Sequence, residues 1–185
     1  MKLFELEERL LHPDRIKKAL INWAKENYPD TLKLDKTIAG VAFYDQLKVE
    51  GLTRAQFFEG QATPARTNLQ TFERPKDEHV AVYGLRILQG AADPVNTTNW
   101  DDNMVAALKN ATLTFRSNGV IMLRDYPLTE VLQSQTGEYY GLISLKELIF
   151  WAGQSTIEVE IDFDVAPAVL NQNLRVQLLG YGFIS

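Results

Sequence analysis

The chain has 185 residues, a length that fits one domain, alone or with an appendage. It contains no cysteine, which excludes disulfides, thiol catalysis and cysteine-based metal sites and fits assembly in a reducing cytoplasm. The formal net charge of -5, without a dense run of Lys and Arg, argues against direct binding to nucleic acid, because that binding relies on clustered basic side chains.

The sequence carries no recognisable signal for a membrane or for secretion. No apolar run approaches the ~20 residues that a membrane span needs. The first eight residues contain three acids and no uninterrupted apolar region, unlike a signal peptide. We therefore expect a protein made and kept inside the cell, and contact with a membrane stays an open question.

Residues 1–30 are predicted to form an N-terminal helical segment in two pieces. Pro13 suits the first position of the second helix, and Pro29 ends that helix. An apolar stripe with helical spacing runs along both pieces and comprises Leu6, Leu10, Ile16, Leu20 and Trp23. Two interpretations stay open for this stripe: it covers one end of the following domain, or it reaches as an arm into a neighbouring subunit.

From residue 31 onward the apolar residues alternate, which predicts a β domain over residues 31–185. In the stretch 79–88, one face is expected to carry Val80, Val82, Gly84 and Arg86, and the other Ala81, Tyr83, Leu85 and Ile87. Asn118-Gly119 between two β runs predicts a hairpin, because a type I′ turn needs positive φ at both central residues. A short helix is expected over residues 101–109.

The clearest predicted strand runs from Thr156 to Val165 and alternates apolar with acidic residues. Its acidic stripe comprises Glu158, Glu160, Asp162 and Asp164. Three interpretations stay open: a solvated face that discourages aggregation, a docking face for basic groups of a neighbouring subunit, or a catalytic pair. A last strand is expected over residues 173–184, with a bend or bulge at Gly180 and Gly182.

The common motifs of enzymes and metal sites are missing. Without an HExxH, GxSxG, Walker A or GxGxxG pattern, we expect no enzyme, no cofactor and no metal site. The histidines are His12, expected to cap a helix or lie on the surface, and His79, which follows Asp77 and Glu78. That trio could ligate a metal, but a charged loop entering a strand has the same pattern. A hydrolase with two carboxylates distant in sequence stays a further hypothesis.

The aromatic residues support a second hypothesis about function. Seven of them suit either a core, a subunit interface or a platform on which sugar rings stack: Trp100, Tyr139, Tyr140, Phe150, Trp151, Tyr181 and Phe183. A stacking platform would make the chain a carbohydrate-binding or receptor-binding module. That alternative requires Trp100 or Trp151 to be exposed.

Turn signals between several strands, without alternating helices, predict an antiparallel β-sandwich. Over roughly residues 50–183, the order of several short patterns resembles the jelly rolls of bacteriophage virion proteins. These patterns are Phe57-Phe58, Thr67-Asn68-Leu69, the strand at 80–87, the Asn-Gly hairpin, the strand at 156–163 and the closing stretch Asn173-Leu174-Arg175-Val176-Gln177-Leu178-Leu179-Gly180-Tyr181. The resemblance implies a mainly β, jelly-roll-like sandwich with an N-terminal helical segment, in a capsid or capsid-associated subunit with no catalytic residues.

We therefore expect a structural virion protein, assembled in the host cytoplasm, that associates with itself and with other shell proteins to build a phage capsid. Whether it is a major capsid, penton or decoration protein stays open. The candidate subunit contacts are the helical stripe and the acidic stripe, that is Leu6, Leu10, Ile16, Leu20, Trp23, Glu158, Glu160, Asp162 and Asp164.

Overall fold

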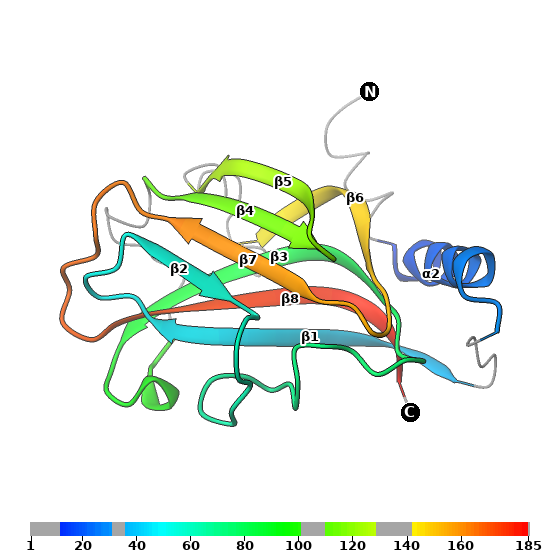
Figure 1. Ribbon diagram of the computed structural model, residues 1–185, viewed down its shortest axis with the longest axis horizontal. Helices are drawn as coiled ribbons and strands as arrows, with labels where there is room; N and C mark the ends of the chain where they lie inside the picture. The colour runs from blue at the N-terminus through cyan, green and yellow to red at the C-terminus, as the bar shows by residue number, and fades with distance from the viewer. Residues whose placement is uncertain (1–11, 31–35, 101–109, 129–141, 185) are drawn as a thin grey trace.

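The computed structural model describes residues 12–30, 36–100, 110–128 and 142–184, and shows a helix packed beside two β-sheets (Figure 1). Its elements in chain order are α2 (Pro13–Asn27), β1 (Thr37–Lys48), β2 (Arg54–Phe57), β3 (Val80–Ala91), the 3-10 helix η1 (Val95–Thr97), β4 (Thr112–Ser117), β5 (Val120–Pro127), β6 (Leu142–Trp151), β7 (Ile157–Asp162) and β8 (Gln172–Ile184). The helix expected over 101–109 lies outside the described residues.

The two sheets have the strand order of a jelly roll. One sheet runs β1-β8-β3-β6 and the other runs β2-β7-β4-β5. Neighbouring strands pair antiparallel throughout. Strands that are consecutive in sequence therefore alternate between the sheets, except for the β4–β5 hairpin, as expected for two Greek keys wrapped into a sandwich. The predicted fold class is confirmed.

The core lies between the two sheets and is built from the alternating strands. On β7 the side chains of Ile157, Val159 and Ile161 are buried, and on β8 those of Leu174, Val176 and Leu178 meet them in the same cluster. Period-two patterning thus placed one face of each strand inside, because successive side chains of a strand point to opposite faces. On β7 the prediction fails at the end of the strand, where the chain leaves the sheet and Val165 is exposed.

The β4–β5 hairpin has the predicted turn. Ser117 pairs with Val120, and the two central residues have positive φ, 49° at Asn118 and 75° at Gly119. Glycine adopts this conformation without a steric cost, and asparagine tolerates it better than most residues. The Asn-Gly prediction is confirmed.

The predicted faces of β3 are wrong beyond Tyr83. The pairing register shifts between Val82 and Gly84, on both the β6 side and the β8 side. One extra residue in a strand reverses every following side chain. Leu85 therefore lies in the main core on the same side as Val82, whereas the alternation had placed them on opposite faces.

The glycines of β8 serve close packing rather than a bend in their own strand. β8 pairs without interruption with β1 from Asn173 to Ile184. A Cβ on Gly180 would lie 2.6 Å from the carbonyl oxygen of Ala81, so only glycine lets β3 approach this closely. The predicted irregularity exists, but it lies opposite, in β3.

Helix α2 begins at Pro13 and ends just before Pro29, as predicted. His12 precedes it with an exposed side chain, and its backbone carbonyl accepts hydrogen bonds from the N–H groups of Arg15 and Ile16. The helix lies across the outer face of the β1-β8-β3-β6 sheet, at the end where β8 finishes (Figure 1).

Candidate interaction surfaces

The helical stripe is covered by the chain itself where it is described. Ile16 and Leu20 are 1% and 0% exposed and pack with Ala81 and Phe183 of the sheet. Of the two interpretations, the structure shows the helix covering its own domain, so these two residues are no free subunit contact. Trp23 is half-buried and stacks on Phe150 with ring centroids 4.7 Å apart. Leu6 and Leu10 lie outside the described residues, and an arm in a neighbouring subunit stays a prediction.

The acidic stripe meets basic groups of its own sheet. Asp162 accepts a hydrogen bond from Nε of Arg54 on β2 at 2.6 Å. Glu160 lies between two arginines, 3.8 Å from Nη1 of Arg54 and 3.6 Å from Nη2 of Arg116 on β4. These partners leave Glu160 only 8% exposed, although it stands on the outer face of the sheet. The basic groups expected from a neighbouring subunit are thus supplied within the chain.

The two ends of the stripe are less enclosed. Glu158 is half-buried on β7, where its Cα partner across the ladder is Arg116. Asp164 is exposed and lies beyond the end of β7. A docking role for these two carboxylates stays a prediction, whereas Glu160 and Asp162 already have basic partners on the neighbouring strands.

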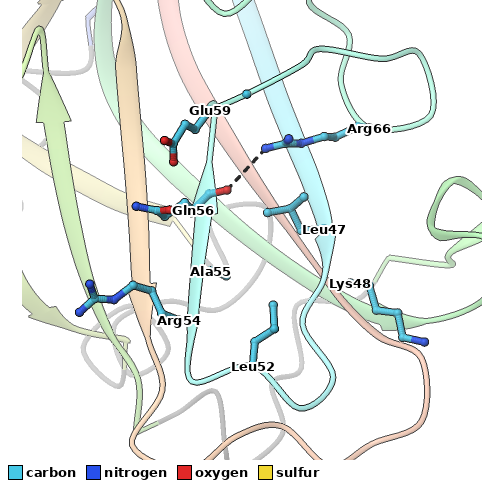
Figure 2. A pocket seen from close by; sticks show the side chains of 9 residues that line it. Leu47, Lys48, Leu52, Arg54, Ala55, Gln56, Glu59 and Arg66 are labelled. Carbon is cyan, nitrogen blue, oxygen red and sulfur yellow. Dashed lines mark hydrogen bonds between the residues drawn. The ribbon is translucent and has the colours of Figure 1, made fainter.

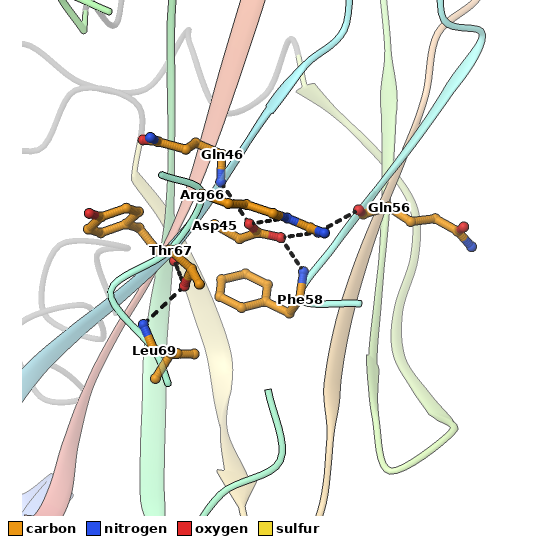
Figure 3. A network of polar contacts seen from close by, with 8 residues as sticks. Asp45, Gln46, Gln56, Phe58, Arg66, Thr67 and Leu69 are labelled. Carbon is orange, nitrogen blue, oxygen red and sulfur yellow. Dashed lines mark hydrogen bonds and ion pairs between the residues drawn. The ribbon is translucent and has the colours of Figure 1, made fainter. Parts of the chain in front are cut away.

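A buried ion pair that the sequence did not reveal lies beside this sheet (Figure 3). The carboxylate of Asp45 is 0% exposed and accepts two hydrogen bonds from Arg66, at 2.7 Å and 2.6 Å. The backbone N–H groups of Phe58 and Gln46 donate to the same carboxylate. Burial raises the pKa of Asp45, against the opposing effect of Arg66 and these N–H groups. The arrangement joins β1 to the loop after β2 and carries no sign of catalysis.

The loop after β2 also covers part of the edge of β1. Asn68 accepts a hydrogen bond from the N–H of Tyr44 at 2.9 Å and donates one to the carbonyl of Ala42 at 2.8 Å. Thr67 forms an isolated antiparallel bridge with Asp45. One side-chain amide thus replaces a neighbouring strand at this edge, which blocks edge-to-edge pairing there. This is the structural role of the Thr67-Asn68-Leu69 pattern.

An open groove of about 370 Å³ lies between the end of β1 and β2. Figure 2 shows Leu47 and Leu52 pointing into it, whereas the charged ends of Lys48 and Arg54 point away. Arg66, which also lines it, is occupied by Asp45. The groove therefore offers apolar surface rather than a preformed site for an anion.

Leu52 of this groove belongs to a group of four exposed apolar side chains in two loops, which we call the loop-end patch: Leu52 is 40% exposed, Val165 64%, Val169 43% and Leu170 72%. They come from the β1–β2 and β7–β8 loops, which lie side by side at the left end of the sandwich in Figure 1. A second group, the β5 patch, comprises Val120, Ile121 and Met122, which are 62%, 37% and 47% exposed. Neither patch could be identified from the sequence, because each of these apolar residues also fits a core.

The loop-end patch is held firmly in place. The N–H of Gly51 in the first loop donates to the carbonyl of Pro167 in the second at 2.8 Å. The N–H of Asn171 donates to Glu50 at 2.9 Å, and this bond, with help from Lys48, lowers the pKa of Glu50. The exposed side chains therefore project from two loops that are hydrogen-bonded to each other.

The hypothesis of a sugar-stacking platform depends on an exposed Trp100 or Trp151, and neither of these two side chains is fully exposed. Trp151 is 0% exposed, and its Nε1–H donates to the carbonyl of Ser155 at 2.9 Å, which excludes a role in stacking on a sugar. Trp100 is half-buried, and its ring centroid lies 4.3 Å from the guanidinium carbon of Arg175. The same guanidinium carbon lies 4.3 Å from the ring centroid of Tyr44. Tyr139 and Tyr140 lie outside the described residues.

Neither a metal site nor a membrane helix is found in the part of the chain that the structure describes. No three His, Asp or Glu side chains are grouped there so as to hold a metal ion, and His79 is completely buried. Among the same residues, no helix has the length and apolar character to cross a bilayer. No protein-family model and no curated protein matches the sequence.

Proposed function

We propose that this chain is a non-enzymatic structural subunit of a virion shell, of the kind found in bacteriophage capsids, and that it associates with copies of itself and with other shell proteins. The observation that supports this most is the loop-end patch. Its four apolar side chains stand exposed at one end of a sandwich whose core is already complete without them.

Apolar side chains exposed to water carry an unfavourable free energy of hydration, which association with another subunit removes. Monomeric domains expose scattered apolar residues, whereas a contiguous patch marks an interaction site. Each square ångström of apolar surface taken from water contributes about 25 cal/mol. Because hydrogen bonds between the two loops already fix their conformation, little conformational entropy is lost when a second subunit binds to them. The adjacent groove, with Leu47 and Leu52 pointing into it, can receive an apolar side chain from a second copy.

The two patches lie at opposite ends of the sheet that contains β7. Asp162, which precedes the β7–β8 loop, pairs with Thr112 at one end of β4, and Ile157 pairs with Ser117 at the other. The β5 patch follows Ser117 across the hairpin. Two different surfaces at opposite ends favour head-to-tail contacts between copies, which close into rings when the rotation allows.

The test is light scattering on the purified full chain over a range of concentrations, with Leu170→Glu and Met122→Glu. Each variant alone is expected to abolish large assemblies, because one half of every head-to-tail contact is lost. A mixture of the two is expected to form a dimer, since one intact loop-end patch can still meet one intact β5 patch. Gln70→Glu, which adds the same charge at an exposed site outside both patches, is the matched control.

Other results would redirect the proposal. If Met122→Glu still assembles while Leu170→Glu does not, the loop-end patch pairs with itself. If the unmodified chain is monomeric at every concentration and is missing from particles, the shell proposal is wrong. Recovery of the chain from purified virions by protein identification would tie it to a shell directly.

A further inference from the structure

His79 is a fully buried titratable group whose two ring nitrogens have different surroundings. Nδ1 accepts a hydrogen bond from the backbone N–H of Gly153 at 3.1 Å, so this nitrogen carries a lone pair and the proton sits on Nε2. Nε2 is buried and, within the described residues, has no hydrogen-bond partner. The imidazole is thus held as one neutral tautomer.

The imidazole lies directly beneath the end of helix α2. Tyr28, which caps the helix, has its ring centroid 4.7 Å from that of His79, and Trp23 has its centroid at 5.7 Å. The ring of Phe183 on β8 also contacts the imidazole edge-on, with ring centroids 6.2 Å apart. The helix therefore keeps water from the ring, and a positive charge on the ring would have to be desolvated for the helix to stay docked.

Gly153 cannot simply turn away to accommodate a second donor. A Cβ at this residue would lie 2.2 Å from the carbonyl oxygen of Lys76, which shows how closely the β6–β7 turn packs on the preceding loop. A proton on Nδ1 would face the N–H of Gly153 donor to donor. The hydrogen bond would be lost, and both groups would be left buried without acceptors.

We propose that His79 is a proton-sensitive latch for helix α2: protonation of Nδ1 weakens the docking of the helix on the sheet, so acidification releases it. Release would uncover the apolar stripe of Ile16, Leu20 and Ala24 together with the sheet surface beneath it. Such surfaces are available to a second copy, but the latch concerns contacts within one chain and does not depend on the shell proposal.

Burial sets the direction in which the pKa of His79 shifts, and the charged groups around the ring modify it. Burial lowers the pKa of His79, with Asp77 acting against this shift and Lys36 adding to it. Asp77 and Lys36 also pair with each other at 2.9 Å. From the helix side the facing titratable group is Tyr28, and from the β6–β7 turn the facing group is the N–H of Gly153.

The direction of the pH dependence of helix docking follows from the lowered pKa of His79. Above the ordinary pKa of 6.5, His79 is neutral whether the helix is docked or released, and docking is at full strength. Below 6.5 the released state takes up the proton more readily than the docked state, because the pKa of His79 is lowered in the docked state. The opening constant of the helix is therefore expected to rise by up to about tenfold per pH unit, until the pKa of the docked state is reached.

The test combines two measurements on the full chain from about pH 8 to about pH 5, the range in which histidine titrates. Hydrogen exchange of the α2 amides, corrected for its intrinsic pH dependence, gives the opening constant, and NMR follows the His79 ring protons. We expect the opening constant to rise as His79 titrates. His79→Asn, which can accept the Gly153 hydrogen bond but cannot be protonated, should remove the pH dependence, and His12→Asn at the exposed helix start should retain it.

The latch is overturned if the opening constant rises equally in His79→Asn, or if His79 becomes protonated while α2 exchange stays unchanged. If His79→Asn does not fold, the unmodified chain still decides. The rise in opening must then occur over the same pH range as the His79 titration, and a rise elsewhere in pH would contradict the proposal. Because assembly is not measured, failure here leaves the shell proposal untouched.

Discussion

Two aspartate–arginine pairs of this protein have the same closest distance and very different surroundings. Asp45 with Arg66 and Asp162 with Arg54 each approach to 2.6 Å. The side chain of Asp45 is 0% exposed, whereas that of Asp162 is 34% exposed and that of Arg54 is 59% exposed. Water therefore competes much more strongly for the second pair than for the first, in which the carboxylate is fully enclosed and only Arg66 retains some contact with solvent. Burial, rather than distance, decides what an ion pair contributes.

The largest effect is expected at the buried pair. Asp45→Ala removes the acceptor for the Arg66 guanidinium and for the N–H of Phe58, whereas the N–H of Gln46 still donates to the backbone carbonyl of Arg66. Breaking a buried pair from one side typically costs about 3–5 kcal/mol. We expect the free energy of unfolding, measured by urea denaturation, to fall by an amount near the lower end of that range, because Arg66 keeps some contact with solvent.

A double-mutant cycle sharpens this expectation. Arg66→Met retains most of the side-chain volume over the ring of Phe72 but leaves the Asp45 carboxylate without its counter-ion. The double variant Asp45→Ala, Arg66→Met should lose less than the sum of the single losses, since neither buried charge is then left alone. Strict additivity would contradict a coupled pair and would remove the contrast with the exposed one.

A middle-sized effect is expected at the covered edge of β1. Asn68→Ala removes both side-chain hydrogen bonds to the strand, and each such bond contributes about 1 kcal/mol or somewhat less at an exposed site. The uncovered edge should also raise the rate of aggregation, followed by light scattering at constant protein concentration. Gln70→Ala, which removes an exposed side-chain amide two residues further along the same loop, is the control. Unchanged aggregation in Asn68→Ala would show that the loop backbone alone protects the edge.

The smallest effect is expected at the exposed pair. Arg54→Ala should lower the free energy of unfolding only slightly, and by far less than Asp45→Ala, because the arginine is mostly in solvent and Glu160 keeps Arg116 as a neighbour. The loss should shrink further when salt is added, since exposed charges are screened. Arg54→Lys, which keeps the charge, should be close to the unmodified chain. A loss as large as that of Asp45→Ala would overturn the distinction between the two pairs.

Local sequence patterns predicted the parts of this protein that depend on neighbours in the chain. Pro13 marks the start of α2, Asn118-Gly119 forms the hairpin turn, and alternation on β7 and β8 identifies the core faces. Each of these signals arises from backbone geometry within a few residues: a fixed φ, a positive φ, or the two-residue period of a strand. Such signals need no knowledge of which elements become neighbours.

The candidate interaction surfaces could be predicted less well, because a side chain's partners come from elsewhere in the chain. The acidic residue Glu160 fits a docking face by its pattern, yet Arg54 and Arg116 flank it once β2 and β4 lie on either side of β7. Leu170 is an apolar residue of a type usually found in the core, yet its side chain is 72% exposed on a loop. Composition and spacing do not distinguish these outcomes.

By itself, the sequence determined a mainly β sandwich with a helix before it, and the positions of its helix start, hairpin and core strands. Only the tertiary structure decided that α2 lies on its own sheet, that β3 changes faces after Val82 and that His79 is sealed beneath the helix. The physical reason is the range of the interactions. Dihedral preferences and side-chain periodicity act within a few residues, whereas burial and pairing depend on contacts such as those of His79 with Trp23 and Gly153, which exist only after the chain has folded.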